Sequence, residues 1–358
     1  MNKNLLILII VFAISIISCK QTATKKIIGV KIYDITENID SLINEWKTLG
    51  INTAFVSDKI AANKEFRQKA SSNNIVVFII EPIFFNPEIL LQDSSLYAIT
   101  NKGNIAKNDW VEFVCPSNTG YHKIIINKLI NDVKQLNPDG ISIDFIRHFL
   151  YWEMVKPNQR ADSIEHGCFC NRCISSFTNQ TGINIPDTFF CKKEQANFIL
   201  QNYKTQWAAW KSNLISDFVK EITVTLKNIK PDLKFNLHAV PWRSYDYNGG
   251  IKYLAGQDFS TLKNYVDYIS PMCYSFMLYR NGNWIHSVVN NIDSCANNKI
   301  LPSIQVGKEY RVEDITNKEF ELYLQNALKT PSQGVIFWSW EHLDKEPTKK
   351  NIIKKYCK

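Results

Sequence analysis

Short apolar segments alternate with longer amphipathic segments along most of this chain. Apolar runs with a strand-like period of two predict eight strands, at 27–33, 53–56, 75–80, 140–145, 234–240, 266–274, 300–306 and 334–340. Between most of these runs, apolar residues recur at intervals of three and four. This spacing predicts helices over 39–49, 59–71, 121–136, 197–229 and 317–328.

The alternation of strands and helices indicates parallel strands joined by crossover helices. Eight such strands in one chain favour a closed (β/α)8 TIM barrel over an open sheet. We therefore expect residues 26–358 to form a single α/β barrel domain. The extra length lies at 84–117 and at about 150–196, after the third and fourth strands. Loops at the carboxyl ends of barrel strands commonly build the substrate cleft.

The first eighteen residues resemble a targeting segment. Lys3 precedes an apolar run over 5–17, which has the length of a signal-peptide core and is short for a membrane span. The run ends in Ile16-Ile17-Ser18-Cys19, which resembles a bacterial lipobox with Cys19 as the lipidated residue. We expect 1–18 to be a lipoprotein signal peptide, 19–25 a tether, and the protein to be exported and lipid-anchored in the bacterial cell envelope.

Composition excludes one class of partner. The chain is 45% hydrophobic and 21% charged, which is ordinary for a globular protein, and its formal net charge is +8. The lysines are scattered or terminal and form no basic stripe interleaved with aromatic residues. We therefore expect no binding to nucleic acid.

The fourth predicted strand carries the leading catalytic candidate. In Asp139-Gly-Ile-Ser-Ile-Asp-Phe-Ile-Arg147, the apolar residues alternate with Ser142 and Asp144. A carboxylate on an inward-facing strand position is costly unless it is paired or functional. At the carboxyl-end mouth of a barrel such a residue is usually catalytic. The alternative interpretation is a structural ion pair between Asp144 and Arg147.

Glycoside cleavage requires two carboxyl groups on either side of one bond. Glu341, after the eighth strand, and Glu81, after the third, are the candidates to act with Asp144, and Glu153 is a more distant one. Asp34, after the first strand, is a further carboxylate that would face a substrate. The sequence leaves the identity of the second catalytic carboxylate open.

Several aromatic and basic residues follow predicted strands and are candidates for substrate binding. Flat rings suit the apolar faces of sugars, and an aromatic pocket raises the pKa of a catalytic acid by desolvation. For any single ring or histidine, packing in the core is the commoner role. The candidates are Arg147, His148, Trp152, His238, Trp242, Tyr274, Trp338 and Trp340.

A cysteine cluster, His166-Gly-Cys-Phe-Cys-Asn-Arg-Cys173, lies in the second long loop. Cys168, Cys170 and Cys173, with His166 or Cys191 as a fourth ligand, would suit a closed tetrahedral zinc site. Disulfides are the alternative, because an exported protein meets an oxidising environment. Either arrangement would act as a structural staple, and we expect no cofactor for catalysis.

The 139–147 segment resembles the fourth strand of the glycosyl-hydrolase-like lipoproteins, a group of glycosidase-like (β/α)8 barrels. The segments Val266-Asp-Tyr-Ile-Ser-Pro-Met-Cys-Tyr274 and Gly334-Val-Ile-Phe-Trp-Ser-Trp340 resemble later strands of that group and of chitinase-type barrels. One departure is that Ile146 stands where chitinase-type enzymes carry their catalytic acid. The cysteine cluster is similar to a zinc-binding structural loop of certain β-galactosidases.

This resemblance implies a glycoside hydrolase acting on a polysaccharide or oligosaccharide, with cell-wall glycan as one candidate because a relative acts on peptidoglycan. A non-catalytic glycan-binding lipoprotein is the alternative, favoured by the missing chitinase-type acid. A lyase or another hydrolase with Tyr274 or His238 as proton carrier is a third hypothesis. The expected partners are carbohydrate and membrane, and the sequence leaves the oligomeric state open.

Overall fold

The computed structural model describes residues 26–297 and 299–357. The predicted signal peptide 1–18 and the whole predicted tether 19–25, which includes Cys19, therefore lie outside the described residues. Within the described part of the chain, no helix has the length and apolar character needed to cross a membrane.

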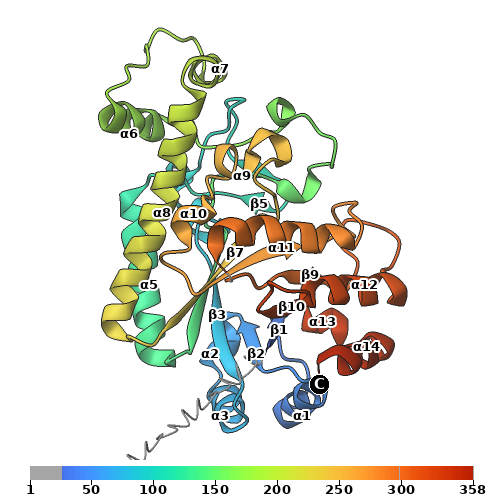
Figure 1. Cartoon of the computed structure of the whole chain (residues 1–358). Coiled ribbons are helices and arrows are strands. Elements are labelled where there is room, and N and C mark those ends of the chain that lie inside the picture. Colours follow the sequence, from blue (N-terminus) through green and yellow to red (C-terminus); the bar gives the residue numbers. More distant parts are fainter. Residues whose placement is uncertain (1–25, 298, 358) are drawn as a thin grey trace, which may run out of the picture.

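Eight parallel strands close into a barrel, as the sequence predicts (Figure 1). Around the barrel their order is β1, β10, β9, β8, β7, β6, β3 and β2. All eight predicted strands are present, some with shorter bounds. They are β1 (Ile27–Ile32), β2 (Thr53–Val56), β3 (Val76–Pro82), β6 (Gly140–Asp144), β7 (Lys234–Ala239), β8 (Tyr268–Cys273), β9 (Ser303–Gln305) and β10 (Gly334–Trp338).

Helices cover the outside of the barrel (Figure 1). The predicted helices at 39–49 and 317–328 form with those bounds, as α1 (Ile39–Leu49) and α12 (Asn317–Leu328), and 121–136 becomes α5 (Thr119–Leu136). The other two predicted helices are each divided. They become α2 (Asp58–Ala62) with α3 (Lys64–Ser72), and α7 (Lys192–Asn202) with α8 (Lys204–Ile229). Further helices, outside the predicted ranges, are α9 (Gly250–Tyr253), α10 (Phe259–Leu262), α11 (Asn283–Ala296), α13 (Trp340–Leu343) and α14 (Pro347–Cys357).

Local sequence explains several helix ends. The Asn38 side chain accepts hydrogen bonds from the first amides of α1, and Gly50 ends this helix in the left-handed conformation. A side-chain cap of this kind contributes about 1 kcal/mol. Asn63 ends α2 and caps the start of α3, which is why the predicted helix at 59–71 is broken there.

The barrel has an inner and an outer core because alternate strand residues face opposite sides. Phe55, Phe78, Ile80, Leu301 and Ile336 fill the inside, and a larger cluster packs between strands and helices. Gly140 is required beside this inner layer, since a Cβ there would lie 2.2 Å from the Phe78 ring.

A polar layer follows the inner apolar layer toward the carboxyl ends of the strands. Ser142 Oγ lies 2.9 Å from His238 Nε2 and accepts a hydrogen bond from the Asn236 amide. The Ser270 hydroxyl in turn donates to the side-chain oxygen Oδ1 of Asn236. These contacts show that the four side chains point into the barrel. Asp144 lies two residues beyond Ser142 and therefore on the same inner face of β6.

Both long insertions follow the carboxyl end of a strand, as predicted. The first, after β3, holds α4 (Pro87–Gln92), η1 (Ser94–Leu96), β4 (Lys107–Asn108) and β5 (Val111–Glu112). The second, after β6, holds η2 (Trp152–Met154), η3 (Ala161–Ser163) and α6 (Asn171–Thr181) before α7. In Figure 1, α6 and α7 lie together at one end of the long helix α8.

Candidate active site

A cavity of about 680 Å³ lies at the carboxyl ends of the barrel strands. Asp144, the last residue of β6, lines it together with Lys31 of β1 and Trp338 of β10. Tyr274, just after β8, lines it as well. This is the face on which barrel enzymes carry their active sites.

Asp144 is buried and has a cationic neighbour. Its Oδ2 lies 4.0 Å from Lys31 Nζ, and its Oδ1 accepts a hydrogen bond of 2.7 Å from the amide of Phe145. The Lys31 amine also donates to the Tyr274 hydroxyl, at 3.3 Å. Burial lowers the pKa of Lys31 to about 8, and the charge of Asp144 opposes this shift. Lys31 was not among the predicted site residues, although it is a charged residue between Val30 and Ile32 on the inward period of a strand.

Glu153, in η2, is another carboxylate that lines the cavity. Its Oε2 is buried without a hydrogen-bond partner. Burial raises the pKa of Glu153 to about 7, and the nearby Arg147 opposes this effect, whereas the charge of Asp144 adds to it. The arrangement therefore pairs a strand-borne carboxylate next to a cation with a loop-borne carboxyl group that holds its proton up to neutral pH.

Arg147 lies between these acids and the apolar wall of the cavity. Its guanidinium donates to the carbonyl of Leu150 at 2.6 Å and lies 4.6 Å from the centre of the Phe113 ring. Burial lowers the pKa of Arg147 to about 10, and the charges of Glu153 and Asp144 oppose this shift. The side chain is thus fixed by its own loop, and the simple Asp144–Arg147 ion pair considered from the sequence is replaced by the contact with Lys31.

Glu81 borders the cavity but faces away from the barrel interior. Its neighbour Ile80 belongs to the inner core and Ile79 to the outer one, so Glu81 points toward the helices. There it accepts from Lys128 of α5, at 2.5 Å. Burial raises its pKa to about 7, and the Lys128 charge opposes this. The ion pair with Lys128 engages this carboxylate, and the role of Glu81 beside Asp144 stays a prediction.

Glu341 lies in α13 and does not line the cavity. Its Oε1 accepts from the amides of Tyr33 and Asp34, at 2.6 and 3.2 Å, and its other oxygen is buried without a partner. The carboxylate thereby binds the chain end that leaves β1. The catalytic role of Glu341 stays a prediction, and this position gives it no support.

The predicted substrate-binding residues divide into two groups. Arg147, Trp152, Tyr274 and Trp338 line the cavity. The rings of Tyr274 and Trp338 are stacked with their centres 4.1 Å apart, and Trp152 packs beside Tyr274. These three rings form an aromatic cluster that gives the cavity an apolar surface.

The remaining predicted binding residues lie outside the cavity lining. Asp34 is exposed and pairs with Lys59, and Trp340 donates to Glu37. The other three are buried and packed elsewhere: His148 contacts the carbonyl of Lys211, His238 contacts Ser142 inside the barrel, and Trp242 packs on Tyr247. Besides Lys31, the cavity residues that sequence reasoning missed include Phe85, Trp110, Phe145, Glu309 and Tyr310.

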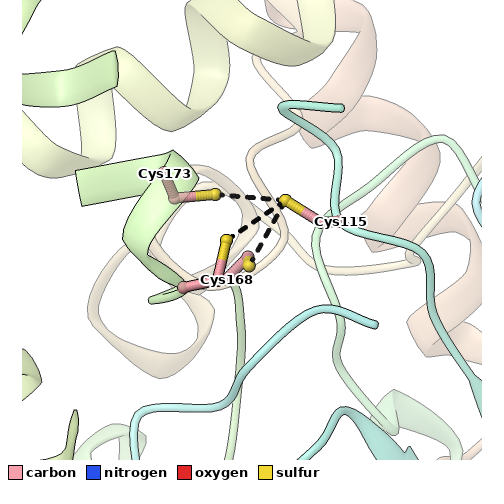
Figure 2. Close-up of side chains that lie close together, drawn as sticks. Cys115, Cys168 and Cys173 are labelled. Carbon is pink, nitrogen blue, oxygen red and sulfur yellow. Dashed lines mark hydrogen bonds between the residues drawn. The ribbon is translucent and has the colours of Figure 1, made fainter. Parts of the chain in front are cut away.

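Four cysteines form a compact cluster between the two insertions (Figure 2). Cys115 Sγ lies 3.6, 3.4 and 3.5 Å from the sulfurs of Cys168, Cys170 and Cys173. These distances are far longer than a disulfide bond of about 2.05 Å, and all four sulfurs lie within 4.8 Å of one another. Hydrogen bonds from Cys115 and the other two thiols lower the pKa of Cys170.

The cluster corrects the predicted ligand set. Cys115, 53 residues before Cys168, takes the fourth place. Cys191 is exposed and His166 Nδ1 contacts the carbonyl of Ile164, so neither belongs to the group. Zinc with four thiolates at about 2.3 Å requires sulfurs about 3.8 Å apart, so the observed donors fit a closed tetrahedral site.

No protein-family model matches the chain, and no curated protein matches its sequence. Among solved structures, the beta-galactosidase from the psychrophilic Marinomonas ef1 is similar, with a TM-score of 0.68, 10% identity and 92% of this chain covered. The chain spans 59% of that enzyme's length. The PgaB (BpsB) glycoside hydrolase domain from Bordetella bronchiseptica is similar with a TM-score of 0.69 and 11% identity. The match covers 92% of this chain and 98% of that domain.

The chain shares the barrel fold of these glycoside hydrolases. A third similar structure, the Bacillus megaterium spore cortex-lytic enzyme SleL, has a TM-score of 0.52 at 9% identity, with 93% of this chain and 74% of that one covered. The predicted glycosidase-like (β/α)8 barrel is thereby confirmed as a fold. At these identities the likeness shows the fold.

Proposed function

We propose that this protein is a glycoside hydrolase that cleaves glycosidic bonds in a polysaccharide or oligosaccharide. The observation that carries the proposal is the joint presence of Asp144 and Glu153 in one aromatic-walled cavity at the barrel mouth. The fold shared with a beta-galactosidase and with the PgaB glycoside hydrolase domain supports it.

The two carboxyl groups suit different roles. Glu153, whose pKa is raised to about 7 by burial, is the general acid that protonates the leaving oxygen. Asp144, beside the Lys31 amine, is the carboxylate that attacks the anomeric carbon or activates water. The stacked Tyr274 and Trp338 rings, with Trp152, hold the sugar face against these groups.

Release of reducing ends tests the proposal. The chain lacking residues 1–19 is incubated with a panel of plant, host and peptidoglycan glycans, beside Asp144→Asn and Glu153→Gln variants. We expect reducing ends from the wild type and a loss of about 10²-fold or more in each variant. Glycan binding by all three proteins without any release would instead support the non-catalytic glycan-binding alternative.

The same proposal includes the cell envelope as the place of action. The Ile16-Ile17-Ser18-Cys19 sequence supports export and a lipid anchor on Cys19, and SleL, a spore cortex-lytic enzyme, shares the fold. Cell-wall glycan is therefore the first substrate to test. Labelling of the full-length chain with radioactive palmitate in a bacterial host, and loss of label in Cys19→Ala, tests the anchor.

We also propose that Cys115, Cys168, Cys170 and Cys173 hold a structural zinc ion. Zinc prefers four thiolates in closed structural sites, and these four sulfurs come from two insertions that both border the cavity. The residues would supply a complete ligand set with no open position, so the ion would staple the loops and take no part in bond cleavage.

A further inference from the structure

Two loops from opposite sides of the barrel meet over the cavity. Asp109 and Trp110 form the turn between β4 and β5, in the insertion after β3. Tyr310 lies in the loop after β9. Around the closed barrel, β6, β7 and β8 separate β3 from β9 on one side, and β2, β1 and β10 separate them on the other. The two loops therefore leave from diametrically opposite strands.

Hydrogen bonds connect the two loops directly. Trp110 Nε1 donates to the Tyr310 hydroxyl. Tyr151, from the loop after β6, joins them: its hydroxyl donates to Asp109 Oδ2 at 3.1 Å and lies 3.3 Å from the Tyr310 hydroxyl. We call Asp109, Trp110, Tyr151 and Tyr310 the mouth bridge.

The mouth bridge belongs to the same cavity as the two carboxyl groups. Trp110 and Tyr310 line the cavity and are 42% and 41% exposed. Trp110 is held edge-on against Phe85 and Phe145, with ring centres 5.6 and 6.1 Å away. Phe145 directly follows Asp144, so the bridge is anchored next to the reacting group.

A bridge of this kind restricts how a glycan reaches Asp144. A polysaccharide cleaved in its interior continues out of the site on both sides of the cleaved bond. Beneath a closed bridge such a chain gains access only by threading from an end. A short oligosaccharide or the end of a long chain enters without this constraint.

We propose that the mouth bridge is a specificity determinant that selects short oligosaccharides and chain ends over the interior of a polysaccharide. The proposal rests on the glycan-binding cavity of the proposed function and adds the size class of its substrate. The bridge residues act by exclusion, since the hydrogen bonds of their side chains are with each other.

Binding in an Asp144→Asn background tests this inference separately from catalysis. The probes are soluble β-1,4-galactan, mixed-linkage β-glucan and glycol chitin, measured by affinity electrophoresis, and trisaccharides of the same linkages, measured by calorimetry. The test variant is Trp110→Ala/Tyr310→Ala. The matched control is Val312→Ala, a residue in the same loop that is 87% exposed and outside the bridge.

We expect the intact bridge and the Val312→Ala control to bind a trisaccharide and to be retarded only weakly by the matching polymer. Opening the bridge should strengthen retardation by that polymer about tenfold or more, with trisaccharide affinity changed less than about threefold. The deciding comparison uses a polymer whose trisaccharide binds both to the protein with the intact bridge and to the Trp110→Ala/Tyr310→Ala variant. Equal retardation of these two proteins by that polymer would overturn the inference. If glycans bind selectively but the protein with Asp144 intact hydrolyses none, the proposed function fails and the bridge inference stands.

Discussion

Lys31 Nζ lies 4.0 Å from Asp144 Oδ2, on the inner face of the barrel. Both side chains are buried, and the same amine donates to the Tyr274 hydroxyl. A buried carboxylate without a cation would be expensive to keep ionised. The contact therefore gives the buried carboxylate at the end of β6 a cationic neighbour inside the cavity.

Replacing Lys31 by Met tests this relationship. Without the amine, Asp144 loses its nearby cation and Tyr274 loses a hydrogen bond, so kcat/KM should fall by about tenfold or more. The kcat/KM profile against pH is measured on a glycan that the wild type cleaves, and Lys59→Met, which alters an exposed lysine outside the cavity lining, serves as the control. An unchanged kcat/KM in Lys31→Met would show that the site does not depend on this cation.

Glu153 should determine the basic limb of the same profile. As a general acid it acts when protonated, and its pKa is raised by burial to about 7, so activity should fall as the pH rises through about 7. In Glu153→Gln the basic limb should disappear and kcat should drop by about 10²- to 10⁴-fold. A substrate with a good leaving group, such as a 4-nitrophenyl glycoside, should recover much of that loss. A variant that keeps both its basic limb and its rate would exclude Glu153 as the acid.

Glu81→Gln is the matched comparison for Glu153→Gln. Glu81 is also a buried glutamate at the cavity, but its carboxylate is bound by Lys128, which Asp132 and Asp58 also contact. We expect Glu81→Gln to change kcat by less than about threefold, because its carboxylate is not placed to transfer a proton. A loss as large as that of Glu153→Gln would return Glu81 to the catalytic pair.

The cysteine cluster yields a prediction about metal content. Cys115→Ser should lose the bound zinc, measured by atomic emission of the purified protein, and lower the melting temperature by roughly 10 °C. Cys191→Ser should retain both zinc and stability, because Cys191 is exposed and outside the cluster. Chelation of the wild type should reproduce the Cys115→Ser melting temperature. Full zinc occupancy in Cys115→Ser would mean that another residue supplies the fourth ligand.

Periodic features of the molecule were predictable from sequence, and contacts between distant segments were not. The strand period identified all eight barrel strands and placed Asp144 on the inner face. The same period in β3 predicts that Glu81 points out of the barrel, because Phe78 and Ile80 point into it. In β1 it predicts that Lys31 points into the barrel, where the cavity lies.

Glu153 and Cys115 show where sequence reasoning ends. Glu153 lies in an irregular insertion, and its position over the cavity follows from the packing of that loop rather than from any repeat. Cys115 is 53 residues from Cys168, and nothing in its own neighbourhood indicates a ligand. Their roles depend on loop–loop contacts, which only the folded chain supplies.

The four-cysteine cluster also has a topological consequence. Cys115 and Cys173, 58 residues apart, meet in space, so a zinc ion bound there as proposed would join the two ends of one closed segment of chain. That segment contains β6 and with it Asp144, Arg147 and Glu153. Such a link would lower the conformational entropy of the unfolded chain, by an amount that grows only slowly with loop length. The residues proposed to carry the reaction would then lie within a single closed loop, which would hold the strand-borne acid and the loop-borne acid together.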